Sequence, residues 1–176
     1  MNNIIDPPSN RKTIRLPYHD YASFAAYHVT VCTYEHGMLL SSIIDGRVAL
    51  SDIGAIVEQE WLSTADVRRE VTLDCFVIMP NHVHAILQID PGSNMVGASK
   101  SVTDSRSIAH YPSKSLGALM GGWKSCVTSR VRRETSLAEG KLWQPRYYDT
   151  IIRDDIQLAR TREYINTNPA RWRQDT

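Results

Sequence analysis

The segment Met79-Pro80-Asn81-His82-Val83-His84-Ala85-Ile86-Leu87 is the most informative part of this chain. We interpret it as a β-strand, on which side chains two residues apart leave the backbone from the same face. His82 and His84 therefore point to one place, whereas Val83, Ala85 and Leu87 take the other face and can pack on a core. Two neutral imidazoles that converge on one spot form half of a site for a divalent metal ion.

The histidine strand is expected to lie in an antiparallel sheet. Residues 71–79 predict a second strand, and a tight turn at Pro80-Asn81 would lead from it into the histidine strand, which ends near Asp90. β-branched and aromatic residues alternate over 27–33, which predicts another strand, and residues 147–153 predict a core or edge strand. Residues 34–46 indicate a loop or short hairpin.

Helices are predicted at three places. A helix over 51–63 has Ser51 as a good N-cap, and apolar residues at helical spacing predict an amphipathic helix over 115–134. A final helix, capped by one of the aspartates at 154 and 155, would run to Asn168 and be stopped by Pro169. This order of elements predicts an α+β fold, in which helices cover the antiparallel sheet mainly on one face.

Length and composition are those of an ordinary globular protein. The 176 residues, 42% of them hydrophobic and 22% charged, suffice for one domain with a substantial core. We expect residues 1–22 to form an N-terminal arm and residues 23–173 to form a single domain. Residues 91–113 are rich in Ser and Gly and lack periodicity, so we interpret them as a flexible insertion in that domain.

The sequence favours a cytoplasmic protein. No stretch reaches the roughly 18 consecutive apolar residues of a membrane span, and the N-terminal residues lack the apolar region of a secretion signal. The three cysteines, Cys32, Cys75 and Cys126, are an odd number without CxxC spacing. Each lies in an apolar or helical context, which indicates buried and reduced thiols.

A tyrosine near the end of the sequence carries the second chemical signal. Tyr164 and Asn168 are four residues apart on the final predicted helix, so they share a face. A phenol, with a pKa of about 10, is a poor nucleophile at neutral pH without help. A divalent ion would help by polarising the scissile phosphate, and the amide oxygen of Asn168 is a candidate third ligand beside two imidazoles. The alternative is that Tyr164 packs in the core and Asn168 only caps the helix.

The histidines also have plainer interpretations. A histidine on a strand is usually structural. The pattern is also similar to the three alternating histidines of the histidine-triad nucleotide hydrolases, although Ile86 stands at the third place. The other histidines lie in ordinary contexts and are expected on the surface or in loops: His19, His28, His36 and His110.

Several blocks of the sequence resemble one protein family. Residues 79–84 resemble the HUH motif of small insertion-sequence transposases with a single catalytic tyrosine, with Val83 as the bulky hydrophobe between the histidines. Residues 143–153 (WQPRYYDTIIR) look like the strand block of the REP-associated tyrosine transposases. Residues 162–172 (REYINTNPARW) resemble their tyrosine helix, with its Tyr-x-x-x-Asn-Pro ending, and residues 27–33 are similar to their opening strand.

This resemblance implies a ferredoxin-like (palm-type) domain that cuts single-stranded DNA at or near imperfect palindromic hairpins. It implies Tyr164 as the nucleophile, His82 and His84 as ligands of Mg²⁺ or Mn²⁺, and Asn168 as the third ligand. Attack by Tyr164 would give a covalent 5′-phosphotyrosine and a free 3′-hydroxyl, which can later rejoin strands without another source of energy. The working unit would be a monomer or a homodimer.

The charge distribution is compatible with a DNA partner. The net charge is only +1, but the C-terminal third of the chain is the more basic part. Candidates for phosphate contacts are Lys124, Arg130, Arg146, Arg153 and Arg171, and candidates for stacking on unpaired bases are Trp143, Tyr147 and Trp172. The alternatives are a solvated helix face for each charge and a core position for each tryptophan.

Three functions therefore stand beside one another. The first is a metal-dependent single-strand DNA endonuclease and strand transferase that uses Tyr164, with Tyr147 and Tyr148 as rival nucleophiles on the predicted strand. The second is a domesticated relative that binds hairpin DNA or RNA without cutting it. The third is a nucleotide hydrolase that uses the histidine strand. Covalent, metal-dependent cleavage of DNA would indicate the first function, and tight hairpin binding without cleavage would indicate the second. Turnover of small nucleotides without DNA would indicate the third.

Overall fold

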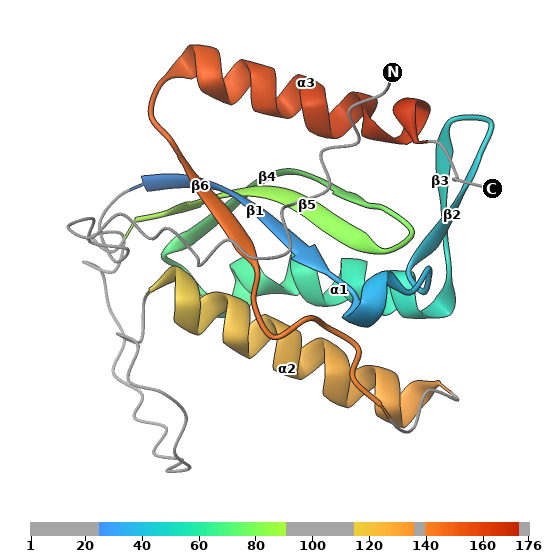
Figure 1. Cartoon of the computed structure of the whole chain (residues 1–176). Helices are drawn as coiled ribbons and strands as arrows, with labels where there is room; N and C mark the ends of the chain where they lie inside the picture. The colour runs from blue at the N-terminus through green and yellow to red at the C-terminus, as the bar shows by residue number, and fades with distance from the viewer. Residues whose placement is uncertain (1–24, 91–114, 136–139, 173–176) are drawn as a thin grey trace, which may run out of the picture.

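The computed structural model describes residues 25–90, 115–135 and 140–172 (Figure 1). The expected arm at 1–22 and the expected insertion at 91–113 lie outside these residues, so the domain division stays a prediction. The elements in chain order are β1 (Ala25–Cys32), the 3-10 helix η1 (Tyr34–His36), β2 (Ser41–Ile44), β3 (Arg47–Leu50), α1 (Asp52–Val67), β4 (Val71–Ile78), β5 (His82–Ile89), α2 (Leu116–Glu134), β6 (Tyr148–Ile152) and α3 (Asp155–Arg171).

Four strands form one antiparallel sheet in the order β4-β5-β1-β6. The histidine strand, β5, lies between β4 and β1, and its His84 is directly opposite Thr30 of β1. The β2-β3 hairpin forms a separate two-stranded sheet. Without that hairpin, the order β-α-β-β-α-β up to β6 is the ferredoxin-like arrangement. The predicted α+β fold with an antiparallel sheet is therefore confirmed.

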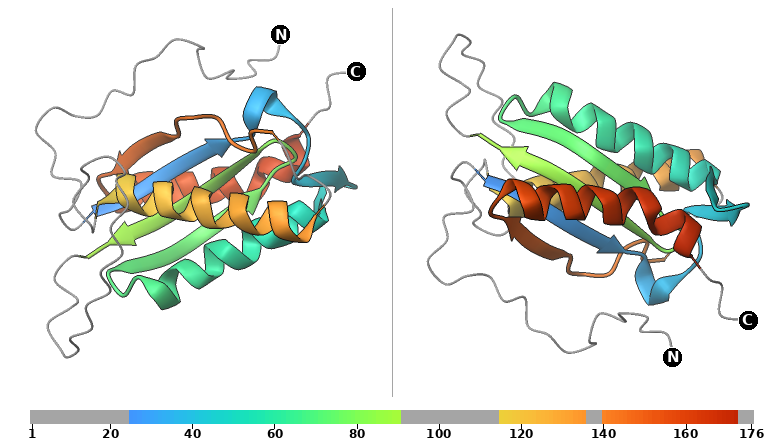
Figure 2. Two further views of the ribbon diagram at one scale, coloured as in Figure 1. Left: turned by 90° about the horizontal axis from the view of Figure 1, so that it is seen from below. Right: turned by 90° about the horizontal axis from the view of Figure 1, so that it is seen from above.

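Helices α1 and α2 cover one face of the sheet and enclose the main hydrophobic core (Figure 2). Val83, Ala85 and Leu87 of β5 belong to this core, as the alternation of the histidine strand predicts. Trp61 of α1 and Trp123 of α2 pack edge to face, with ring centroids 5.3 Å apart. The helices thus lie mainly on one face, and the histidines are left to the other face of the sheet.

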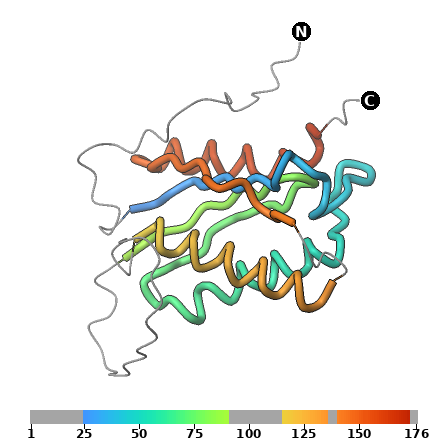
Figure 3. Tube along the Cα trace, turned by 60° about the horizontal axis from the view of Figure 1, so that its bottom comes forward, coloured from blue at the N-terminus to red at the C-terminus, as the bar shows by residue number. Residues whose placement is uncertain are grey.

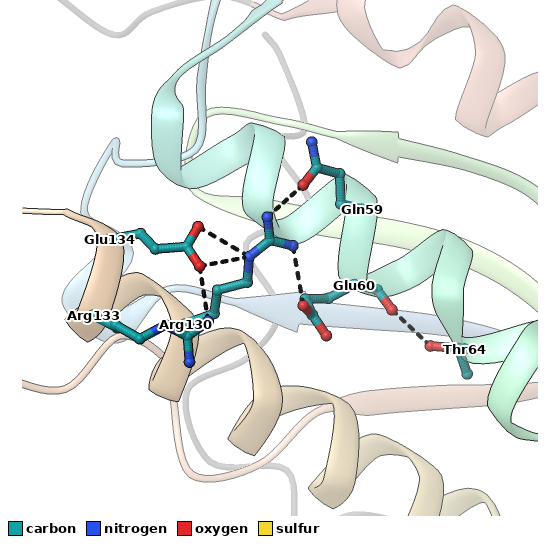
Figure 4. Close-up of polar contacts among 6 residues, drawn as sticks. All are labelled: Gln59, Glu60, Thr64, Arg130, Arg133 and Glu134. Atoms are coloured by element: carbon teal, nitrogen blue, oxygen red, sulfur yellow. Dashed lines mark hydrogen bonds and ion pairs between the residues drawn. The ribbon is translucent and has the colours of Figure 1, made fainter.

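A polar cluster joins α1 to α2 at the surface of this layer (Figure 4). The guanidinium of Arg130 lies 3.1 Å from Glu60 through Nη1, donates to Gln59 over 2.6 Å through Nη2, and contacts Glu134 at 3.1 Å through Nε. Arg130 had been a candidate for a phosphate contact from the sequence. Each of the three guanidinium nitrogens contacts one of these partners, so Arg130 links the two helices, and its contact with a phosphate stays a prediction.

Helix α3 lies on the opposite face of the sheet from α1 and α2 (Figures 1 and 2). Its Ile165 is fully buried and packs with Ile86 of β5 and Ile152 of β6. At the surface, Arg162 of α3 forms a two-pronged ion pair with Asp74 of β4, with an Nη2–Oδ2 distance of 2.6 Å. These contacts place the middle of α3 over the sheet.

The end of α3 differs from the sequence-based expectation. The helix passes through Pro169 and ends at Arg171, whereas we predicted a stop before the proline. A proline lacks the N–H that would bond to the carbonyl four residues before it, here that of Ile165. This loss falls in the last turn, and the backbone N–H of Trp172 closes that turn on the Pro169 carbonyl at 3.2 Å. Helix α1 also ends one turn later than expected, at Val67.

The cysteines are free, but only one is buried as expected. Cys32 is buried, Cys75 is half-buried and Cys126 is exposed. The expectation for Cys126 was wrong because α2 turns that residue away from the core that its apolar neighbours fill. In the described part of the chain, no helix is both long enough and apolar enough to cross a membrane.

Candidate active site

Three histidines gather on the face of the sheet that α3 covers. His82 and His84 leave β5 on this face because their neighbours Val83 and Ala85 fill the core on the other face. His28 of β1 joins them, with its ring centroid 5.3 Å from that of His84. Adjacent antiparallel strands thus bring together residues that are far apart in the sequence.

The phenol of Tyr164 lies directly against this histidine group. Its hydroxyl oxygen is 3.3 Å from Nε2 of His84, and the two ring centroids are 5.2 Å apart. Tyr164 is 43% exposed although it contacts a buried histidine, so a partner from solvent can reach it. The fold therefore brings the predicted nucleophile next to one of the two predicted metal ligands.

His82 is oriented by the turn that precedes its strand. Its Nδ1 lies 2.7 Å from the side-chain oxygen of Asn81, which can only accept a hydrogen bond, so Nδ1 carries the proton and donates. The lone pair of a neutral His82 is then on Nε2. The rings of His82 and His84 are 4.6 Å apart between centroids, and Trp172 at the end of α3 lies 5.9 Å from His82.

The surroundings keep both strand histidines neutral. Burial lowers the pKa of His82 to about 4, helped by the charge of His36. Burial lowers the pKa of His84 to about 2, helped by the neighbouring His82 and His28. A neutral imidazole is the form that binds a metal ion. The chemistry of these two donors fits the divalent ion that the sequence resemblance implied.

The third ligand is the least defined part of the site. Among the described residues, no group of three or more His, Cys, Asp or Glu side chains is arranged to hold a metal ion. Asn168 is half-buried on α3, one turn after Tyr164. An amide oxygen on this helix is compatible with a site of two imidazoles and one amide, and its role as a ligand stays a prediction.

His28 was wrongly expected on the surface or in a loop. Its Nε2 lies 3.3 Å from Nδ1 of His84, and burial lowers the pKa of His28. The signal was present in the alternation of residues 27–33, where Tyr27 and Val29 face the core and His28 must face away. What the sequence did not supply was the pairing of this strand with the histidine strand.

Comparison with known proteins shows the family. No family model matches the chain. An uncharacterized protein of Haemophilus influenzae (strain ATCC 51907 / Rd) is 32% identical over 167 residues, which cover 94% of this chain and 92% of that protein. The chain belongs to the same family as this Haemophilus protein.

Two solved structures share the fold of the present chain. The structure of a REP-associated tyrosine transposase bound to a REP hairpin aligns with a TM-score of 0.59 at 16% identity, over 87% of this chain and 71% of that one. The crystal structure of a candidate transposase from Deinococcus radiodurans R1 aligns with a TM-score of 0.51 at 17% identity, over 85% of this chain and 95% of that one. The chain has the fold of a REP-associated tyrosine transposase, as the sequence resemblance implied.

In this transposase fold, two of the candidate DNA contacts lie on the α2 side of the sheet. Trp143 is only 7% exposed and packs on Trp123 with ring centroids 5.3 Å apart, which is the core position held as its alternative. Nζ of Lys124 donates to the carbonyls of Gln144 at 2.5 Å and Pro145 at 3.4 Å. These bonds hold Gln144 and Pro145 to α2, in the segment that leads into β6 (Figure 3).

The remaining basic candidates, Arg146, Arg153 and Arg171, are exposed, whereas the stacking candidates Tyr147 and Trp172 are half-buried. Arg153 lies between β6 and the start of α3, and Arg171 is the last residue of α3. These two arginines therefore flank the helix that carries Tyr164. Their positions suit contacts with a phosphate backbone that passes over the site.

Proposed function

We propose that this protein is a metal-dependent single-strand DNA endonuclease and strand transferase that acts through a covalent bond to Tyr164. The observation that carries the proposal is the 3.3 Å contact between the Tyr164 hydroxyl and Nε2 of His84, on a tyrosine that solvent can reach. A structural tyrosine would bury its ring. Here the hydroxyl contacts a neutral imidazole, and 43% of the residue stays exposed to solvent.

The reaction exchanges one phosphate ester for another. The hydroxyl oxygen of Tyr164 attacks the phosphorus of the scissile phosphodiester and releases its proton to water. The bond between phosphorus and the 3′-oxygen breaks, and that oxygen takes up a proton to become a 3′-hydroxyl. The product is a 5′-phosphotyrosine, and attack by another 3′-hydroxyl reverses the step and joins strands. Because the ester energy is conserved, no nucleotide cofactor is consumed.

His82, His84 and Asn168 would hold the Mg²⁺ or Mn²⁺ ion. When bound, the ion would polarise the scissile phosphate and offset the charge that develops on it. The protein contributes two neutral imidazoles whose ring centroids are 4.6 Å apart, and Asn81 sets the orientation of His82. The ligand atom of His84 and the nucleophile lie 3.3 Å apart, so both would act on the same phosphate.

Hairpin DNA is the proposed substrate. The transposase that shares this fold is bound to a REP hairpin, and the exposed Arg153 and Arg171 flank the tyrosine helix of the present chain. We infer that a hairpin with a single-stranded flank places that flank across α3. A domesticated protein that only binds such a hairpin is the alternative.

A suicide substrate tests the proposal. A hairpin oligonucleotide with a nicked flank is incubated with the protein and Mn²⁺, and the products are separated on a denaturing gel. We expect a covalent protein–DNA adduct that Tyr164→Phe abolishes. Tyr148→Phe is the matched control, because Tyr148 is a tyrosine of β6 that is also partly exposed. Adduct formation by Tyr164→Phe would refute the assignment of Tyr164 as the nucleophile. Tight hairpin binding by the wild type without any adduct would favour the alternative of a protein that only binds DNA.

A further inference from the structure

His84 has a polar partner at each of its ring nitrogens. Nδ1 lies 2.9 Å from the hydroxyl oxygen of Thr30 and 3.3 Å from Nε2 of His28. Nε2 lies 3.3 Å from the hydroxyl oxygen of Tyr164. The two sides of one buried ring thus face different parts of the molecule: β1 on the Nδ1 side and the candidate nucleophile on the Nε2 side.

The position of one proton decides what this ring can do. A neutral imidazole carries its proton on one nitrogen and a lone pair on the other. If the proton is on Nδ1, the lone pair of Nε2 faces Tyr164 and is able to accept a hydrogen bond or bind a metal ion. If the proton is on Nε2, that side of the ring becomes a donor and loses both abilities.

The partners of His84 favour the proton on Nδ1. A phenol, with a pKa of about 10, is a stronger acid than an aliphatic alcohol, and it is therefore the better hydrogen-bond donor of the two hydroxyls beside the ring. Tyr164 then donates to Nε2, and Nδ1 must donate to Thr30, its nearer partner. His28 offers a second acceptor to the same N–H when its own Nε2 is unprotonated.

The sheet holds these partners in place. Thr30 is directly opposite His84 in the pairing of β1 with β5, and His28 is two residues earlier on the same face of β1. A β-branched side chain such as that of Thr30 has few accessible rotamers, so its hydroxyl position is well defined. Partners of this kind orient a metal-binding histidine and fix which nitrogen carries the proton.

We propose that Thr30 and His28 are positioning residues that keep the proton of the His84 ring on Nδ1 and leave the Nε2 lone pair facing Tyr164. The functional role of this arrangement rests on the proposed function, because only that tautomer allows Nε2 of His84 to bind a metal ion beside the nucleophile. The tautomer itself is a property of the protein without metal, so it is measurable independently.

Nitrogen chemical shifts of the histidine rings test the proposal. In the full-length protein without metal, at a pH of about 8 where imidazoles are neutral even at their ordinary pKa, long-range ¹H–¹⁵N spectra report which nitrogen carries the proton. We expect His84 of the wild type to show a protonated Nδ1 and an unprotonated Nε2. Thr30→Val and, separately, His28→Phe should populate the other tautomer, and Thr30→Ser should restore the wild-type pattern.

Thr72→Val is the matched control, because Thr72 is an exposed strand threonine of β4. It should leave the His84 shifts unchanged. A wild-type His84 protonated on Nε2 overturns the proposal even if a variant fails to fold. An unchanged tautomer in a folded Thr30→Val or His28→Phe protein overturns the role of that residue.

Mn²⁺ affinity, measured by titration calorimetry, connects the inference to function. Loss of a partner that orients a metal-binding histidine costs about 10- to 100-fold in affinity, which we expect for Thr30→Val, with recovery in Thr30→Ser. An unchanged affinity in Thr30→Val contradicts the positioning role at the metal site. If the wild type shows the expected tautomer but binds no Mn²⁺, the metal-dependent function fails and the positioning of His84 by Thr30 stands.

Discussion

Tyr164 shows how one side chain can be both held and available. Its hydroxyl contacts Nε2 of His84 at 3.3 Å, yet 43% of the residue is exposed. His84, by contrast, is buried, and its low pKa keeps it neutral at every pH at which the protein would function. A neutral, buried imidazole that can bind a metal ion, next to an exposed phenol, is suited to act on a charged substrate that arrives from solvent.

Removal of one imidazole should eliminate metal binding. We expect His82→Ala to weaken Mn²⁺ binding by at least about 100-fold, since loss of an orienting partner alone costs about 10- to 100-fold, and to abolish the covalent adduct. Arg133→Ala is the control, because Arg133 is exposed on α2, on the opposite face of the sheet, and pairs with Glu134. Calorimetric titration with Mn²⁺ compares the two variants. Equal affinities would show that the ion, if one binds, does not use β5.

Helix α3 is the element on which the site depends, and it rests on a small apolar contact. Ile165 is its one buried residue among those described, and it packs with Ile86 and Ile152. The ion pair of Arg162 with Asp74 adds a surface contact, and it lowers the pKa of the Asp74 carboxyl. The position of Tyr164, next to Ile165, is therefore set by a few side chains.

Truncation of Ile165 should loosen this helix. We expect Ile165→Ala to lower the free energy of unfolding by about 2–5 kcal/mol, as for other buried isoleucines, and to slow adduct formation. Ile156→Ala on the same helix should change stability by less than about 0.5 kcal/mol, because Ile156 is 66% exposed. Urea denaturation measures both variants. Similar losses in the two would mean that α3 is not held through Ile165.

The elements were predictable from the sequence where a single pattern dominates. Alternation predicted β1, β4 and β5 to within about two residues, the cap Ser51 marked the start of α1, and the spacing of apolar residues predicted α2. The end of α3 was missed because a proline in the last turn costs only one hydrogen bond. The position of His28 was missed because strand pairing, which brings it to His84, is not encoded in local spacing.

At the scale of the whole molecule, the sheet separates stability from chemistry. One face carries the large core under α1 and α2, and the other carries the histidines, Tyr164 and α3 (Figure 2). Trp143 belongs to the first face, which is why its aromatic character, noted in the sequence, did not indicate a DNA contact. The residue type alone does not tell which face of the sheet a side chain occupies, because a tryptophan can equally fill a core or stack on a base.

DNA affinity should depend on the arginines of the α3 side. Arg153→Ala and Arg171→Ala should each weaken hairpin binding across sequences and reduce the slope of log affinity against log salt by about 1, as expected for one lost phosphate contact. Arg133→Ala is the control, since Arg133 is exposed on α2, across the sheet, and pairs with Glu134. Fluorescence anisotropy at several salt concentrations gives the slopes. A lower slope only in Arg133→Ala would place the DNA on the wrong face for the proposed reaction.

The most direct measurement locates the covalent bond itself. The adduct formed with a hairpin suicide substrate and Mn²⁺ is digested with trypsin and nuclease, and the peptides are analysed by mass spectrometry. The account predicts a nucleotide 5′-phosphate on Tyr164, in the peptide of residues 163–171. A nucleotide on another residue, or no adduct at all under conditions where the hairpin binds, would contradict it.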